Sequence, residues 1–82
     1  GTDDFEAIAF KYYPNPVSDR LNLVASENID SVEIYNLLGQ RVFSKKLDAM
    51  QEQLDFSQLP KGTYILKAAI GNVMKNVKIV KK

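Results

Sequence analysis

The alternation of polar and apolar residues near the end of this 82-residue sequence constrains its fold more than any other feature. In residues 73–82, lysine or asparagine alternates with aliphatic residues, and the stretch ends on Lys81 and Lys82. Successive side chains of a strand point to opposite faces of a sheet, so this pattern predicts a half-buried β-strand. Because domain ends fray unless something holds them, we expect this last strand to pair with another.

The same alternation recurs in shorter stretches through the rest of the chain. We expect extended segments at residues 5–12, 20–24, 32–36, 41–47, 53–56, 63–68 and 73–82. The side chains that the pattern directs inward are Ile8, Phe10, Tyr12, Leu21, Leu23, Val32, Ile34, Tyr64, Leu66 and Ala68. About seven short strands at near-regular spacing are typical of an immunoglobulin-like sandwich. The predicted fold class is therefore all-β: an immunoglobulin-like β-sandwich of short antiparallel strands.

A proline-rich corner follows the first segment, at Tyr13-Pro14-Asn15-Pro16. Each proline fixes its own φ, removes a backbone donor and holds the residue before it extended or in a turn. We therefore expect a stiff connection that helps the first strand to cross between the two sheets.

Glycine marks three further connections. Gly39 and Gly62 lie in tight turns, where they can take a positive φ without the penalty of a Cβ atom. Gly71-Asn72 separates two extended runs and predicts a type II′ hairpin that pairs the last strand with residues 63–68. The polar residues 26–28 predict another turn.

Residues Lys46–Leu54 allow two interpretations. Leu47, Met50 and Leu54 have helical spacing, and the intervening residues are good helix formers. We favour a loop that leads into a brief strand at residues 53–56, with a short helix as the alternative.

The absence of histidine and cysteine excludes several kinds of chemistry. The chain has no histidine base, thiolate nucleophile, structural zinc site or disulfide. Its carboxylates include Asp3, Asp4 and Glu6 near the start, and Asp19, Asp30 and Glu33 near turns or on an exposed face. No calcium loop, phosphate-binding loop or nucleophile elbow accompanies them. We therefore expect neither enzymatic activity nor a bound metal or cofactor.

The net charge of +1 is unevenly distributed along the chain. All ten acidic residues lie at or before Asp55, whereas six lysines and no carboxylate follow Phe56. The lysines either form a basic face for an acidic partner or protect exposed sheet edges. The small net charge and the lack of a recognition motif argue against nucleic-acid binding.

The apolar runs are too short to span a membrane, and the N-terminal residues lack the features of an export signal peptide.

Three tyrosines also allow two interpretations. Tyr12, Tyr35 and Tyr64 either form a platform that stacks against sugars or fill the core and send their hydroxyls to backbone partners. We favour the core.

Three motifs, in order along the chain, resemble those of one known family. Tyr13-Pro14-Asn15-Pro16-Val17, followed by Leu21-Asn22-Leu23, is similar to its opening YPNP block. Residues 34–42, with Tyr35, Asn36 and Gly39, are similar to its IYNxxGxxV block, and residues 59–66, with Gly62 and Tyr64, to a closing block. This family is the type A C-terminal sorting domain of the type IX (Por) secretion system of Bacteroidetes. The resemblance covers residues 13–82, up to the final Lys78-Ile79-Val80-Lys81-Lys82.

The resemblance implies a sorting signal that acts through protein–protein recognition. Such domains follow a cargo protein, transit the periplasm, are recognised by an outer-membrane translocon and its shuttle protein, and are removed by a sortase-like protease. The cargo then reaches the outer membrane and cell surface or the extracellular space. By position, the recognition signal is Lys78, Ile79, Val80, Lys81 and Lys82, with Gly62 and Tyr64 in support. Residues 1–12 are then a first strand and the junction with an unknown cargo, and residues 13–82 are the sorting domain.

Two alternatives remain from other classes of function. A carbohydrate-binding or adhesive accessory domain of a surface enzyme requires exposed aromatic side chains in a concave patch. A structural spacer requires that the last lysines be dispensable.

Overall fold

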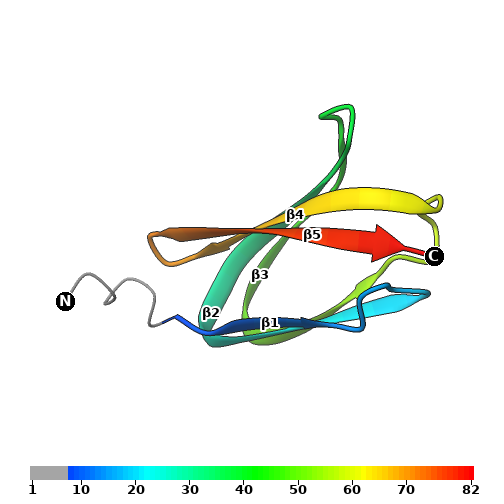
Figure 1. Ribbon diagram of the computed structural model, residues 1–82. Helices are drawn as coiled ribbons and strands as arrows, with labels where there is room; N and C mark the ends of the chain where they lie inside the picture. Colours follow the sequence, from blue (N-terminus) through cyan, green and yellow to red (C-terminus); the bar gives the residue numbers. More distant parts are fainter. Residues whose placement is uncertain (1–7) are drawn as a thin grey trace.

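A computed structural model of the chain describes residues 8–82, which form five β-strands (Figure 1). The strands are β1 (Phe10–Tyr13), β2 (Arg20–Asn36), β3 (Arg41–Asp55), β4 (Gly62–Ile70) and β5 (Val73–Lys81). In the sheet β1, β2, β4 and β5 follow one another, and β3 also pairs with β2. Every one of these pairings is antiparallel, which confirms the predicted fold class. Within residues 8–82, no helix is long and apolar enough to cross a membrane.

Strand β2 belongs to both layers of the curled sheet. Its residues 22–25 pair with β1, and its residues 31–36 pair with β4. Strand β3 pairs with β2 in both layers, and the register of this pairing is interrupted at several points. Figure 1 shows β1 and the start of β2 in one layer, and β4 with β5 in the other. The arrangement is that of a β-sandwich, because two layers of one bent sheet face each other.

The predicted count of about seven strands is wrong, because two of the strands are long and bent. The polar residues 26–28, predicted as a turn, lie within β2, and most of the predicted loop at residues 46–54 lies within β3. The pairing of β2 with β3 shifts register between Val24 and Ile29 and again between Ile29 and Ser31. Such irregularities bend a ribbon without ending it. Each long strand therefore supplies two of the predicted segments.

The helix alternative for Lys46–Leu54 is also wrong. Residues 51–55 pair with β2 in regular register, so the backbone there is extended. Asp48 carries a φ of 95° and accepts a hydrogen bond at Oδ1 from Nδ2 of Asn28, at 3.0 Å. This contact joins the two strands where their register is irregular.

Residues 8 and 9, which were predicted to belong to the first strand, lie outside it. Strand β1 begins at Phe10 and extends to Tyr13, and residues 5–7 lie outside the described residues. Ile8, Phe10 and Tyr12 are partly buried against the core, as the alternation predicted.

The core lies between the two layers, and most of its residues were predicted by the alternation. Those predicted to point inward and found buried are Leu21, Leu23, Val32, Ile34, Tyr64, Leu66 and Ala68. Phe56, in the link from β3 to β4, is fully buried and meets the Tyr64 ring edge to face, with 6.3 Å between ring centroids. The Tyr64 hydroxyl donates to the Pro60 carbonyl at 2.6 Å, which satisfies the polar end of a buried side chain. This bond also fixes the preceding turn to β4.

The predicted turns at Gly39 and Gly71 are confirmed, whereas Gly62 takes a positive φ as the first residue of β4. Gly39, Gly62 and Gly71 have φ values of 84°, 151° and 62°. Gly71 and Asn72 connect β4 to β5, with Ile70 opposite Val73. Among the non-glycine residues from 8 to 82, Asp48 alone has a positive φ. Asn72 therefore has a negative φ, as the predicted type II′ turn requires.

Candidate recognition site on the last strand

Strand β5 carries residues 78–81 of the predicted recognition block, Lys78–Lys82, and pairs with β4 along its whole length, and Lys82 directly follows it. In this register Ile79 lies opposite Tyr64, and Lys81 lies opposite Gly62. The structure therefore brings the block together with the two residues predicted to support it.

The proline-rich corner holds the other edge of β5. Asn15 donates from Nδ2 to the carbonyl of Lys78 at 3.0 Å, and its Oδ1 accepts from the backbone N–H of Val80 at 2.9 Å. The amide supplies both a donor and an acceptor, so one side chain takes the place of a neighbouring strand. Both prolines of the corner follow cis peptide bonds.

Val17 extends this contact along the same edge. Its N–H donates to the carbonyl of Val80 at 2.7 Å, and its carbonyl accepts from the N–H of Lys82 at 3.0 Å. Val17 forms a parallel bridge with Lys81, and its side chain is fully buried. The chain thus pairs with one layer through β1 and with the other through Val17. The predicted crossing between sheets is confirmed.

These contacts engage the backbone of the block on both edges. Strand β4 pairs with one edge as far as Lys81, and Asn15 with Val17 bonds on the other edge to the Lys78 carbonyl, both backbone groups of Val80 and the Lys82 N–H. A partner strand can add here only by displacing those contacts, because an edge needs free N–H and C=O groups to accept another strand. A protein that binds the folded domain at this block must therefore recognise side chains.

The side chains of the block divide between the two faces of the sheet. Ile79 is fully buried, and Lys81 is half-buried on the same inward face. Lys78 and Lys82 are exposed, with the half-buried Val80 between them. The Lys81 ammonium donates to the Lys82 carbonyl at 3.3 Å. Lys78 and Lys82 are the two charges of the block that a partner can reach most directly.

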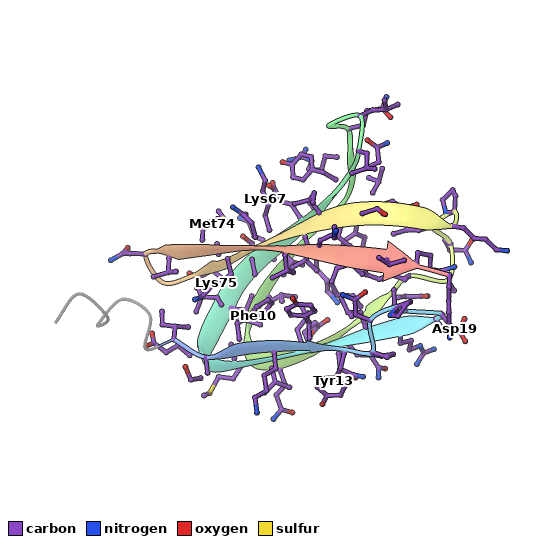
Figure 2. The ribbon with its side chains drawn as sticks, in the orientation of Figure 1. Phe10, Tyr13, Asp19, Lys67, Met74 and Lys75 are labelled. Carbon is purple, nitrogen blue, oxygen red and sulfur yellow. The ribbon has the colours of Figure 1, made fainter. Side chains whose placement is uncertain are left out.

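The exposed side of β5 continues across β4 and β2 as one surface, which we call the outer face. It carries Lys78 and Val80 from β5, Lys82 directly after β5, Ile65 and Lys67 from β4, and Glu33 and Tyr35 from β2. Lys78 lies opposite Ile65, which lies opposite Tyr35. Figure 2 shows Lys67 and Met74 on this side of β5, and Lys75 on the side toward β1.

The outer face is basic because its one carboxylate is neutralised. Glu33 accepts from the Tyr35 hydroxyl at 2.8 Å and pairs with the Arg41 guanidinium at 3.1 Å. The hydrogen bond from Tyr35, together with Arg41, lowers the pKa of Glu33, and the same bond raises the pKa of Tyr35. The Lys67 ammonium lies 4.8 Å from the centroid of the Tyr35 ring. Lys67, Lys78 and Lys82 therefore give the face a positive charge.

The three tyrosines do not form a sugar-stacking platform. Tyr64 is buried, and Tyr12 packs against the core, as we favoured. Tyr35 does not lie in the core: it lies on the outer face, where Glu33 engages its hydroxyl and Lys67 covers its ring. The exposed aromatic patch required by a carbohydrate-binding domain is not formed by these residues.

Sequence reasoning missed how Asn15 and Asn36 act. Asn15 was assigned to a structural motif, but its partners lie 63 and 65 residues away. Asn36 accepts at Oδ1 from the N–H groups of both Leu38 and Gln40, at 3.0 Å each. An asparagine next to a glycine turn was the available signal for Asn36. No local pattern indicated the partners of Asn15.

Comparison with known proteins identifies a family that the chain matches and a relative that it resembles. The model of the family described as "Secretion system C-terminal sorting domain" matches residues 11–82. Over 55 residues, 67% of this chain, the sequence is 38% identical to a protein named β-agarase D from Zobellia galactanivorans. The match spans 11% of that protein, so the chain corresponds to a small part of its length.

Proposed function

Because this chain belongs to the family of C-terminal sorting domains of the type IX (Por) secretion system, we propose that it directs an attached cargo protein through the outer-membrane machinery by protein–protein recognition. Members of this family are sorting signals and not catalytic domains. They are attached to proteins that are exported to the cell surface or extracellular space. The single observation that carries the proposal is the family match over residues 11–82.

The recognition signal in this proposal is Lys78–Lys82, read through its side chains. Lys78 lies in β5 and Lys82 directly follows it, and hydrogen bonds hold the Lys78 carbonyl and the Lys82 N–H, so the folded domain presents the two side chains at a fixed spacing. Carboxylates on the translocon or its shuttle protein pair with these lysines. Contacts between exposed charges are screened over a Debye length of about 8 Å at physiological salt, so they act at short range.

The remaining parts of the proposal concern the path of the protein. The cargo precedes residues 1–12, which form the junction, and the domain transits the periplasm before it reaches the translocon. A sortase-like protease then removes the domain. The outer-face location of Tyr35 and the burial of Tyr64 leave the carbohydrate-binding alternative without a supporting observation.

The test joins residues 2–82 to a periplasmic reporter in a bacterium that carries the secretion machinery. We expect the reporter outside the cell or on its surface. The Lys78→Glu/Lys82→Glu variant should retain the reporter in the periplasm, because it reverses two exposed charges without changing the backbone contacts. The matched control is Lys11→Glu/Lys61→Glu, which changes the net charge equally at two other exposed positions and should be exported.

Two outcomes contradict the proposal at different levels. If the unmodified domain leaves a folded reporter in the periplasm, the sorting function is wrong. If both double variants are exported equally, sorting stands but Lys78 and Lys82 are not its signal.

A further inference from the structure

The tip of the β2–β3 hairpin exposes two neighbouring leucines. Leu37 is 70% exposed and Leu38 is 84% exposed, which makes them the most exposed large apolar side chains among residues 8–82. Figure 1 shows this hairpin projecting beyond the two layers of the sandwich. Exposed apolar side chains are common singly, but an adjacent pair at a projecting tip is a feature of contact sites.

The tip is held in one shape by its own hydrogen bonds. The Asn36 N–H donates to the Gln40 carbonyl at 3.0 Å. The Gly39 N–H donates to the Asn36 carbonyl at 3.0 Å, and the Asn36 Oδ1 accepts from Leu38 and Gln40. The leucines are therefore presented by a preorganised turn, which reduces the entropy lost when they bind.

The tip adjoins the outer face. Leu37 lines an open groove together with Tyr35, Ile65 and Lys67. Ile65 is in turn the cross-strand neighbour of Lys78. A protein that covers this side of the sheet can therefore touch both the leucines and the exposed lysine of the recognition block.

We propose that Leu37 and Leu38 insert into an apolar pocket, rimmed by carboxylates, on the protein of the secretion machinery that recognises Lys78. This inference rests on the proposed sorting function and adds a second contact to it. Charge complementarity defines the rim, because Lys67 lines the groove and Lys78 lies opposite Ile65, while Arg41 neutralises Glu33.

The same charges argue against a second copy of this chain, since two copies would bring two basic faces together. A lipid surface fits less well, because the polar side chains of Asn36 and Gln40 adjoin the leucines and would lose water in hydrocarbon. A protein pocket can offer hydrogen bonds to those amides as well as apolar surface.

The test is the export of the reporter fusion carrying Leu37→Ser/Leu38→Ser. Burial of a leucine corresponds to about tenfold or more in affinity, so we expect the exported fraction to fall at least tenfold. Because both side chains are exposed, the urea midpoint of the purified domain should not change. Met50→Ser, which removes an exposed apolar side chain from β3, is the matched control and should be exported normally.

The outcomes separate this inference from the sorting function. If the unmodified fusion and the leucine variant are exported equally, the inference is overturned but the sorting function stands. Failure of the unmodified fusion to be exported overturns the sorting function itself, and the inference with it.

Two further measurements on the purified 82-residue chain test the type of partner. If the unmodified chain binds vesicles of phosphatidylethanolamine and phosphatidylglycerol and the leucine variant does not, the inference is overturned in favour of a lipid surface. If the unmodified chain forms concentration-dependent dimers in sedimentation equilibrium and the leucine variant does not, the inference is overturned in favour of a second copy. With p-benzoyl-phenylalanine in place of Leu38, crosslinking in cells to an identified component of the secretion machinery supports the inference.

Discussion

The end of β5 and the tip of the β2–β3 hairpin are both organised by an asparagine, but over very different distances. Asn15 bonds to the backbone of Lys78 and Val80, 63 and 65 residues away. Asn36 bonds to Leu38 and Gln40, within four residues. The tip is therefore a local structure, whereas the strand end exists only when the two layers are assembled. The difference teaches that the contacts of the proposed recognition block require distant segments to meet, whereas the hydrogen bonds of the leucine tip form within one hairpin.

The largest effect should come from replacing the glycines of these two regions. Gly62, opposite Lys81, has a φ of 151°, outside the left-handed region that asparagine tolerates, whereas Gly39 has a φ of 84°. We expect both Gly62→Asn and Gly62→Val to lower the free energy of unfolding by about 1–3 kcal/mol. Gly39→Val should have a similar effect, and Gly39→Asn a smaller one.

Urea denaturation of the four glycine variants measures this. A Cβ at either glycine would meet no atom within 4 Å, so the expected loss reflects backbone conformation and not crowding. Equal stability of Gly62→Asn and the unmodified chain would contradict it.

The next largest effect should come from Asn15→Ala. It removes two hydrogen bonds to β5, and we expect a loss of about 1–2 kcal/mol together with faster amide exchange at Val80. Asn15→Asp keeps the acceptor for Val80 but not the donor to Lys78, so Val80 should retain part of its protection. Asn36→Ala is the matched variant of the tip and should leave Val80 unchanged. Hydrogen exchange that is the same at Val80 in all three variants would show that the Asn15 contact does not hold the strand.

A smaller effect on stability is expected from the exposed lysines. Lys78→Glu/Lys82→Glu should change the free energy of unfolding by no more than about 0.5 kcal/mol, since both side chains are exposed. Deletion of Lys81 and Lys82 should instead destabilise measurably, because it removes the bond from the Lys82 N–H to Val17 and the pairing of Lys81 with Gly62. Thermal denaturation compares the two. Equal melting temperatures for the deletion and the charge reversal would mean that these backbone contacts contribute nothing.

The smallest effect concerns Glu33, which lies on the outer face. The hydrogen bond from Tyr35 and the pairing with Arg41 lower its pKa below the ordinary value of 4.5. A lowered pKa contributes stability that is fully present above the unfolded value and is lost as pH falls through the folded value. We therefore expect Glu33→Gln to reduce the loss of stability between neutral and acidic pH. Urea titrations at a series of pH values measure this, and identical pH profiles would refute it.

Much of the fold could be predicted because its signals are local. The inward positions Leu21, Ile34 and Leu66 follow from an alternation visible within a few residues, and the Gly71 turn from two adjacent residues. The polar residues 26–28 were wrongly predicted as a turn, because polar composition is typical of turns. In the structure β2 continues through them. Nothing local distinguishes a turn from a bend in a ribbon whose partner strand also bends.

The sequence by itself determined the strand character of this chain, its inward side chains, its glycine turns and its family. Only the tertiary structure decided that β2 and β3 span both layers, that Tyr35 faces outward, and that Asn15 holds the last strand. The physical reason is the separation along the sequence of the residues that determine each feature. Side-chain alternation and turn conformation depend on neighbouring residues, whereas edge pairing depends on which backbone groups remain free once distant segments have met.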